Sequence, residues 1–281
     1  MNKKREKERV TINIDSAVLK GIDGKVDGRK IRNRSHAIEY FVRQAMQSHE
    51  ISTAFVLAGG KGTRLKPLTD NTPKPMIEVK GKPVLQYVIE LLSKYQIKNV
   101  VIALGYKSEK IQEYFGNGEK FGLNIEYVIE KEPLGTGGPL RLAKDLLVDE
   151  FLMFNGDNLT NINLKDMFEF HKKNNAFATI ALSSVQDPKN FGVIEMEGNK
   201  IRKFIEKPVS PKSNLINSGT YILKPEVIDM IPKGFSLIEK DVFPKLSEQG
   251  KLYGYVYNGQ WFPTDTIERY EQAKKEWKGI I

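Results

Sequence analysis

The chain has 281 residues, 40% of them hydrophobic and 10% aromatic, which is enough for a substantial core in one large domain or two. It contains no cysteine, which excludes disulfides, thiolate metal sites and cysteine nucleophiles. The formal net charge is +9, and residues 1–50, with 12 Lys or Arg against 7 Asp or Glu, hold more than half of the excess, which indicates that this piece meets a polyanion.

The first 50 residues predict a small, separate module. Residues 9–14 alternate strictly between polar and apolar side chains, which is typical of a strand. Asp15 or Ser16 can cap a first helix, and Ser35 can cap a second. One strand and two helices in ~40 residues cannot bury a core alone, and the strand needs a partner at its edges. Antiparallel pairing between two copies would meet both needs, so we expect a homodimer or a higher homo-oligomer.

This arrangement, with the N-R-S helix start at residues 33–35, resembles the ribbon-helix-helix family over about residues 8–48. Members of that family are dimeric modules that lay a two-stranded ribbon in the major groove of DNA. The resemblance implies that the outward strand residues Arg9, Thr11 and Asn13 read base edges, and Arg and Asn can bond bidentately to guanine and adenine. The N-terminus of the second helix would hold a phosphate. The alternative is a dimerisation clip with no role in DNA binding.

An apolar run at residues 55–58 predicts a buried strand that leads into a glycine-rich loop. Three glycines in four residues let the backbone turn sharply and let its N–H groups approach a ligand. Arg64 follows the loop, and Lys74 stands between two prolines. The loop is not a Walker A motif, because Lys61 is followed by Gly62. We expect a polyphosphate cradle, the alternative being a tight surface turn with incidental cations.

From residue 51 onward, strand and helix patterns alternate, and after residue 176 strands dominate. The alternating part predicts a mainly parallel sheet with helices on both faces and ligands beyond the carboxyl ends of its strands. The later part is expected to bind the acceptor. The expected strands are residues 54–57, 99–104, 125–129, 151–154, 176–182, 192–195, 201–204, 220–223 and 253–257, and the expected helices are 84–95, 108–115, 139–147 and 266–277.

The run G-G-K-G-T-R-L-K-P-L-T, followed by P-K-P at residues 73–75, is similar to the signature of the sugar-1-phosphate nucleotidyltransferases. The resemblance implies a mixed, mainly parallel α/β sheet of the Rossmann-like, GT-A-like nucleotidyltransferase type over residues 51–281. It also implies catalytic roles for Arg64, which would grip the leaving pyrophosphate, and for Lys74, which would lie near the reacting phosphates. The nucleotide would lie against Leu57, Gly59, Gly60, Gly62 and Thr63.

The loop E-K-E-P-L-G-T-G-G at residues 130–138 follows an expected strand and opens an expected helix. In the family that the chain resembles, this loop holds the nucleobase, which implies contacts from Glu130 and Gly135. A carboxylate only accepts hydrogen bonds. Guanine offers two adjacent donors, whereas uracil and thymine offer one donor flanked by acceptors. Glu130 therefore favours guanine, the alternative being that it points to solvent.

Two aspartates are expected to hold Mg²⁺. Asp157 ends an apolar strand and so faces the cleft, and Mg²⁺ takes one or two carboxylates plus phosphates. The resemblance implies Asp157 as the first ligand and Asp265 as the second. Asp265 comes four residues after Trp261, whereas the commonest family pattern has the aspartate two residues after the tryptophan, where this chain has Pro263. A similar variant occurs in the glucose-1-phosphate cytidylyltransferases, and Asp265 could instead cap the closing helix.

Two short motifs resemble the sugar-phosphate elements of the same family, E-K-P at residues 206–208 and N-S-G at residues 217–219. The resemblance implies that Lys207 meets the sugar phosphate and has a catalytic role. It also implies that Glu206 and Asn217 bond sugar hydroxyls, with Gly192 beside them. Read alone, E-K-P would indicate only a surface charge pair.

The reaction expected from these residues is NTP plus sugar 1-phosphate giving NDP-sugar and pyrophosphate, with guanylyl transfer to a mannose- or heptose-type 1-phosphate preferred. The alternatives are thymidylyl, uridylyl or cytidylyl transfer to glucose 1-phosphate, and a DNA-binding regulator whose transferase-like domain only senses a ligand. An enzyme that also binds a DNA operator through residues 1–50 stays open. The N-terminus is charged, and no apolar run nears the ~18 residues of a membrane span, which predicts a cytoplasmic protein with no membrane partner.

Overall fold

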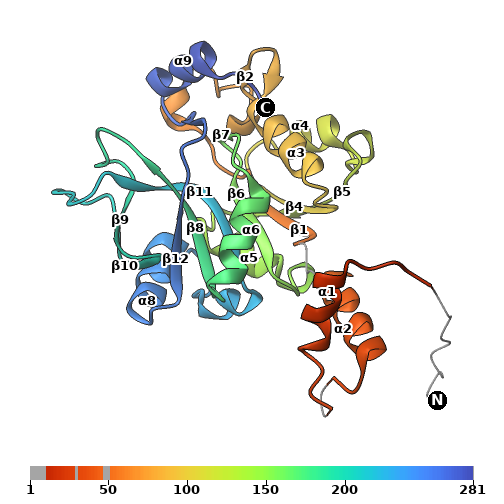
Figure 1. The fold of residues 1–281 in the computed structure, drawn as a ribbon. Coiled ribbons are helices and arrows are strands. Elements are labelled where there is room, and N and C mark those ends of the chain that lie inside the picture. Colours follow the sequence, from red (N-terminus) through yellow and green to blue (C-terminus); the bar gives the residue numbers. More distant parts are fainter. Residues whose placement is uncertain (1–10, 29–30, 47–50, 281) are drawn as a thin grey trace. The chain divides into compact units, whose positions relative to one another are not determined.

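The structure is a computed structural model that describes residues 11–28, 31–46 and 51–280. Its internal contacts divide the chain into two compact units, Met1–Glu50 and Ile51–Ile281 (Figure 1). Within the described ranges, every helix is too short or too polar to span a bilayer.

The first unit contains two helices, α1 (Ser16–Asp23) and α2 (Arg34–Met46). Asp15 caps α1, because its side chain accepts hydrogen bonds from the first backbone amides of the helix. The start of α2 corrects the expectation for Ser35. Asn33 is the residue whose side-chain oxygen accepts from an amide of the first turn, at 2.9 Å, so the helix begins two residues earlier, at Arg34.

This unit leaves much of its apolar surface open. Arg34 ties the two helices together through two hydrogen bonds to the carboxylate of Asp23, at 2.7 and 2.6 Å. Ile12 and Val18, however, are each 56% exposed. The strand expected at residues 9–14 is not formed by residues 11–14 within the described chain, because a lone strand has no hydrogen-bonding partner. Residues 9 and 10 lie outside the described ranges.

The second unit is built on a nine-stranded sheet. Its strands are β1 (Thr53–Leu57), β4 (Asn99–Leu104), β5 (Asn124–Ile129), β6 (Phe151–Asn155), β8 (Ala178–Ser184), β9 (Gly192–Glu197), β10 (Lys200–Glu206), β11 (Leu215–Leu223) and β12 (Leu252–Val256). They lie in the order β5-β4-β1-β6-β11-β8-β12-β10-β9. The first four are mutually parallel, β12 is parallel to β8, and the other neighbours are antiparallel. The sheet is therefore mixed, with its parallel pairs concentrated in the half that carries the glycine-rich loop.

Two small ribbons lie outside this sheet. One pairs β2 (Glu78–Val79) with β3 (Lys82–Pro83), and the other pairs β7 (Asn158–Thr160) with β13 (Trp261–Pro263). The second ribbon joins segments about a hundred residues apart in sequence, and it matters for the site below.

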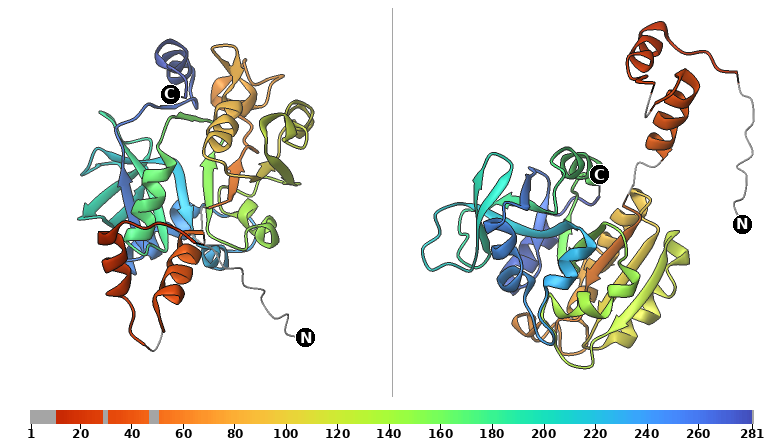
Figure 2. Two further views of the ribbon diagram at one scale, coloured as in Figure 1. Left: turned by 45° about the vertical axis from the view of Figure 1, so that its right-hand side comes forward. Right: turned by 90° about the horizontal axis from the view of Figure 1, so that it is seen from below.

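Helices lie on both sides of the sheet, as the two further views show (Figure 2). The α-helices are α3 (Val84–Lys94), α4 (Ser108–Phe115), α5 (Gly138–Leu142), α6 (Leu164–Lys173), α7 (Ile238–Asp241), α8 (Phe243–Glu248) and α9 (Ile267–Glu276), and the 3₁₀ helices are η1 (Thr63–Leu65), η2 (Lys74–Met76), η3 (Glu119–Phe121), η4 (Lys144–Leu146) and η5 (Pro225–Met230). Alternation along β1 explains the two layers, because Val56 joins a core with α3, α4 and α6 while Phe55 joins one with α5 and α8. A third core joins α3 and α9 around the buried Trp277.

The expected strands and helices of this unit are confirmed as elements, with three differences. The helix expected at residues 139–147 is α5 followed by η4, because the chain leaves α-helical dihedrals at Ala143. Strand β11 begins at Leu215, so that Asn217 lies inside it. Strands β2, β3, β7 and β13 were not expected, since two or three residues carry too little periodicity to be recognised, and helices α6, α7 and α8 were not expected either.

Candidate active site

The glycine-rich loop follows β1 at the carboxyl end of the parallel strands, where it borders a cavity of about 450 Å³. Gly62 has φ +64°, and a Cβ there would lie 2.8 Å from Thr69 and 2.9 Å from Lys74. A Cβ on Gly59 would lie 2.3 Å from a carboxylate oxygen of Glu130. Position 62 therefore requires glycine, whereas a side chain at position 59 would displace the carboxylate of Glu130. The cavity is bordered by all seven residues expected to bind nucleotide, namely Leu57, Gly59, Gly60, Gly62, Thr63, Glu130 and Gly135.

Lys74 and Asp157 form an ion pair on the wall of this cavity. Lys74 begins η2, and Asp157 lies just after β6. The side chains are 12% and 27% exposed, so their attraction is screened less than it would be in open water. The turn that carries Asp157 is fixed by Gly156, whose amide donates to the carbonyl of Leu57 at 2.8 Å.

Asp265 reaches the same wall through the β7–β13 ribbon. In this ribbon Pro263 lies opposite Asn158. The next residue, Thr264, donates both its amide and its hydroxyl to the carbonyl of Asp157, at 3.1 and 2.8 Å. The unusual spacing of the motif therefore still carries Asp265 to the cavity that Asp157 borders.

Two arginines hold the carboxylate of Asp265. Arg64 Nη2 lies 2.9 Å from Oδ2, and Arg269 Nη1 donates to both oxygens, at 2.9 and 3.1 Å. Burial alone would raise the pKa of Asp265, but the hydrogen bond and charge of Arg269, with the charges of Lys74 and Arg64, lower it below its ordinary value. Asp265 is therefore ionised at neutral pH. It does not cap the closing helix, because Thr266 occupies that position and accepts from an amide of the first turn at 3.4 Å.

Asp157 and Asp265 have the donor chemistry that Mg²⁺ prefers, since both offer carboxylate oxygens to the same cavity. In the described part of the chain, no cluster of three or more His, Cys, Asp or Glu side chains could hold a metal by itself. Two carboxylates are nevertheless sufficient for Mg²⁺, because this ion commonly completes its shell with phosphate oxygens and water.

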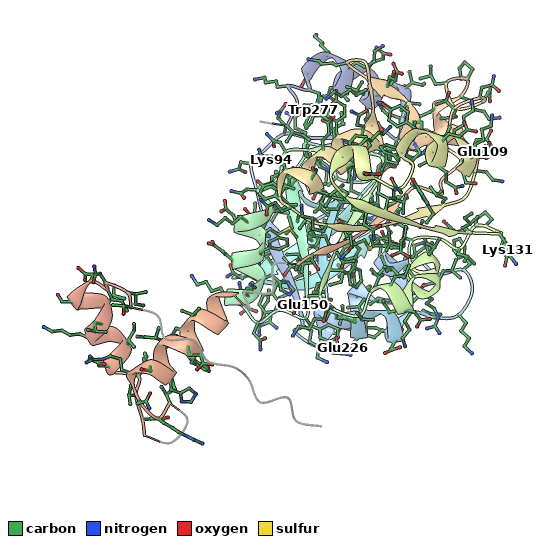
Figure 3. The ribbon with its side chains drawn as sticks, turned by 90° about the vertical axis from the view of Figure 1, so that its right-hand side faces the viewer. Lys94, Glu109, Lys131, Glu150, Glu226 and Trp277 are labelled. Atoms are coloured by element: carbon green, nitrogen blue, oxygen red, sulfur yellow. The ribbon has the colours of Figure 1, made fainter. Side chains whose placement is uncertain are left out.

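Glu130 is half-buried at the end of β5 and faces the same cavity. One of its oxygens accepts from the amide of Leu134 at 3.0 Å. Burial raises the pKa of Glu130, and the Leu134 amide partly opposes that shift. In contrast to the half-buried Glu130, the neighbouring Lys131 is exposed at the outer edge of the unit and points away from it (Figure 3).

A second cavity, of about 300 Å³, adjoins the first and shares with it Arg64, Lys74, Asp157 and Asp265. It is bordered by the four residues expected to meet the sugar phosphate, Gly192, Glu206, Lys207 and Asn217. The structure therefore brings every expected site residue of this unit to one of two connected cavities. The residues expected to contact DNA belong to the other unit, where Thr11 and Asn13 are exposed and Arg9 is outside the described ranges.

Lys207 has an unusual backbone. Its φ is +50°, in the left-handed region that side-chain-bearing residues rarely occupy. Its amide donates to the carbonyl of Phe191 at 3.0 Å, and its ammonium lies 3.5 Å from Glu206. Unfavourable backbone conformations of this kind persist where surrounding contacts enforce them, and they cluster at functional sites.

The side chains that sequence reasoning missed include Thr136 and Glu239, which border these cavities, and Arg269, which contacts Asp265. Arg269 had a usable signal, because it lies four residues after Asp265 and so one helical turn away. Glu239 had no such signal in the sequence, since it lies in the four-residue helix α7 and is buried by contacts with residues distant in sequence. Burial raises the pKa of Glu239, and the hydroxyl of Thr136, which donates to it, opposes that shift.

A glycine-rich loop at the end of the first strand of an α/β sheet, beside paired carboxylates and cations, defines a nucleotide-binding class of protein. Over residues 53–278 the chain matches the Nucleotidyl transferase family, and it belongs to this family. Residues 1–52 lie outside the match.

Among curated relatives, the chain is 42% identical over 212 residues to a mannose-1-phosphate guanyltransferase of Yarrowia lipolytica, covering 73% of this chain and 58% of that protein. It is 40% identical over 236 residues to a mannose-1-phosphate guanylyltransferase of Mycobacterium tuberculosis, covering 82% and 66%. The chain thus spans less than two thirds of these relatives. Among solved structures, HddC from Yersinia pseudotuberculosis complexed with GMP-PN is similar with a TM-score of 0.70 and 28% identity, covering 81% of this chain and 100% of that one.

Proposed function

We propose that residues 51–281 are a catalytic domain that transfers a guanylyl group from GTP to a mannose- or heptose-type sugar 1-phosphate, giving a GDP-sugar and pyrophosphate. The observation that carries the proposal is the pair of connected cavities that share Arg64, Lys74, Asp157 and Asp265. Such an arrangement suits two phosphorylated substrates that meet at one charged junction. The curated relatives named for mannose-1-phosphate guanylyl transfer support the same substrate pair.

The chemistry requires alignment and charge neutralisation. A sugar phosphate is mostly a dianion at neutral pH, since the second pKa of a phosphomonoester is ~6, so it needs no general base. Its oxygen attacks the α-phosphorus of the nucleotide in line, the bond between the α-phosphorus and its bridging oxygen breaks, and pyrophosphate leaves. Arg64 neutralises the leaving pyrophosphate, Lys74 lies beside the reacting phosphates, and Lys207 brings in the sugar phosphate. Asp157 and Asp265 would hold Mg²⁺, which when bound neutralises charge on the phosphate oxygens.

Guanine is the base that the first cavity suits best. One oxygen of Glu130 accepts from the Leu134 amide, and the carboxylate keeps further acceptor capacity towards the cavity. The adjacent donors on the edge of guanine match such an acceptor. The similar structure of HddC in complex with GMP-PN, a guanine nucleotide, supports this choice.

The test is a matrix of five nucleoside triphosphates against a panel of sugar 1-phosphates, scored by pyrophosphate release in the presence of Mg²⁺. We expect the fastest release with GTP and mannose 1-phosphate or a heptose 1-phosphate. Faster turnover of UTP, dTTP or CTP with glucose 1-phosphate would contradict the assignment of the base and sugar. No release from any pair would favour a ligand-sensing regulator instead.

We also propose that residues 1–50 form a ribbon-helix-helix module that dimerises the protein and binds a DNA operator. The two helices and the exposed Ile12 and Val18 support a need for a second copy. Exposed Thr11 and Asn13 support a polar outer face for the ribbon. Binding to operator fragments should weaken steeply with salt and weaken further on replacement of Asn13 by Ala. A protein that is monomeric at micromolar concentration would contradict the module.

A further inference from the structure

Glu239 is a buried carboxylate on the wall of the second cavity, next to the residues that we assign to the sugar phosphate. It is 8% exposed. It borders the cavity together with Glu206, Asn217 and Gly192. In the described part of the chain, no lysine or arginine forms an ion pair with it, although the charge of Lys207 lowers the pKa of its carboxyl group. Burying a carboxylate without an ion-pair partner is costly unless hydrogen-bond donors satisfy it, so its position favours donors from the cavity side.

Thr136 supplies one such donor and belongs to the loop of the other cavity. Its hydroxyl accepts from the amide of Ile238 at 3.0 Å and donates its single proton to Glu239. It borders both cavities. The carboxylate is therefore held in one orientation by a residue of the loop at residues 130–138, which we assign to the nucleobase.

Backbone hydrogen bonds join the loop at residues 130–138 to the segment that leads into α7. The amide of Gly137 donates to the carbonyl of Ser236 at 2.9 Å, and the amide of Ser236 donates to the carbonyl of Leu134 at 3.0 Å. The side chain of Asp241 accepts from the amide of Leu237 at 2.9 Å, which fixes the start of α7. Contacts on rigid elements position a recognition group more precisely than a mobile loop does.

We propose that Glu239 is a specificity-determining residue whose carboxylate accepts hydrogen bonds from hydroxyl groups of the sugar 1-phosphate, and that Thr136 is the positioning residue that orients it. The inference rests on the proposed transferase function and names a further contact in its sugar site. A sugar offers donors that a carboxylate can take, and Glu206 and Asn217 border the same space from β10 and β11. A site built around buried acceptors rejects an analogue that lacks the matching hydroxyl.

The first experiment compares Glu239→Gln and Glu239→Ala with Glu248→Gln, a matched change at an exposed position of α8. We expect KM for mannose 1-phosphate to rise about 10- to 100-fold in the Glu239 variants, as for loss of a hydrogen bond to a charged group. KM for GTP should stay within about twofold, and the Glu248 variant should match the wild type. An unchanged KM for the sugar phosphate in Glu239→Gln would overturn the proposal.

A second experiment uses 2-, 3-, 4- and 6-deoxy analogues of mannose 1-phosphate. The wild type should lose activity most with the analogue that lacks the hydroxyl bound by Glu239. The Glu239→Ala variant should show no further loss with that analogue, because the two changes remove the same bond. Equal further losses with all four analogues would overturn the assignment.

Thr136 is tested by a matched pair. Thr136→Val removes the hydroxyl at nearly constant shape and should raise KM for the sugar phosphate more than KM for GTP. Thr136→Ser keeps the hydroxyl and should restore the wild-type value. A merely structural role would raise KM for GTP and KM for the sugar phosphate alike in Thr136→Val, because the hydroxyl also accepts from the amide of Ile238.

Calorimetric binding of mannose 1-phosphate separates this inference from the transferase function. A wild type that binds the sugar phosphate without turning over, with binding weakened in Glu239→Gln, would refute the enzyme and leave the Glu239 assignment standing. A wild type that binds no sugar phosphate would overturn both. Turnover with a normal sugar KM in Glu239→Gln would overturn only the assignment.

Discussion

At the scale of single residues, the site is organised by opposite charges that neutralise one another. Lys74 pairs with Asp157, and Arg64 pairs with Asp265. The pairing lets four charged groups sit at the edge of a partly buried cavity without an uncompensated charge. A polyphosphate with a bound metal ion carries both negative and positive charge. It can therefore replace one partner in each of the two ion pairs at the same time. Arg64, whose side chain is 60% exposed, has the most freedom of the four to turn towards the pyrophosphate that we propose it binds.

Removal of either kind of charge should nearly abolish turnover. We expect Asp157→Asn and Arg64→Ala each to lower kcat by about 10²–10³-fold, because a preorganised charge at the reacting phosphates is lost. The measurement is steady-state pyrophosphate release at saturating substrates. Asp70→Asn is the control, since Asp70 forms an exposed ion pair with Lys66 that contributes little. Near-normal activity of Asp157→Asn would exclude Asp157 from the chemistry.

Glu130 gives a second prediction at this scale. Glu130→Gln keeps the shape of the side chain but replaces one acceptor oxygen by an NH₂ donor. We expect kcat/KM for GTP to fall about tenfold and the ratio of UTP to GTP turnover to rise. The check is a competition assay with equal concentrations of the two nucleotides. An unchanged ratio would mean that Glu130 does not read the base.

At the scale of elements, the β7–β13 ribbon and helix α9 set the position of Asp265. The ribbon lines up Pro263 with Asn158, and α9 presents Arg269 one turn after Asp265. The guanidinium of Arg269 also stacks on the ring of Phe191, with its Cζ 4.3 Å from the ring centre, and this stacking limits its rotation.

We therefore expect Arg269 to affect metal binding by orienting the carboxylate of Asp265. Arg269→Met is expected to raise the magnesium concentration needed for half-maximal rate about tenfold, because residues that orient a metal ligand commonly contribute this much. Binding of Mn²⁺, followed by electron paramagnetic resonance, should weaken in parallel. Lys274→Met on the same helix removes an exposed pair with Glu271 and a cation–π contact with Tyr270, neither of which involves Asp265, and should change neither value. Tighter metal binding in Arg269→Met would show that the arginine competes with the metal.

The elements also mark the limit of prediction from sequence. Most of the long strands and helices were predictable because each carries its own periodicity, although the ten-residue helix α6 was not anticipated. The glycine-rich loop was predictable because its spacing is distinctive. The ribbon was not, since three residues on each side form strands only through pairing with each other. Asp265 could be named from its motif, but its place beside Asp157 is a product of that pairing. Glu239 could not be named, because its burial against Thr136 joins segments 103 residues apart.

At the scale of the whole molecule, the two units differ in how well they bury their apolar residues. The second unit has three buried cores. In the first, Ala37 is the one fully buried hydrophobic residue among those of residues 11–42 whose burial the structure describes, while Tyr40 and Val42 are exposed along with Ile12 and Val18. We therefore expect a unit of this size, with so few buried hydrophobic residues, to need a partner surface for stability. A second copy of the same chain is the partner that the strand-like pattern at residues 9–14 favours.

Two substitutions on neighbouring residues separate dimerisation from DNA binding. Ile12→Asp places a charge on the apolar face of the expected ribbon and should convert the protein to monomers at micromolar concentration. Thr11→Asp alters the opposite face and should leave the dimer intact while it abolishes binding to operator DNA, because it adds a negative charge next to phosphates. Sedimentation velocity and a DNA mobility assay at two salt concentrations give the two readouts. Both variants should keep the wild-type kcat for sugar-nucleotide formation, since the residues assigned to catalysis all belong to the second unit. A dimer that persists in Ile12→Asp would show that the interface does not include the apolar face of the expected ribbon. A lower kcat in both variants would show that catalysis depends on the first unit.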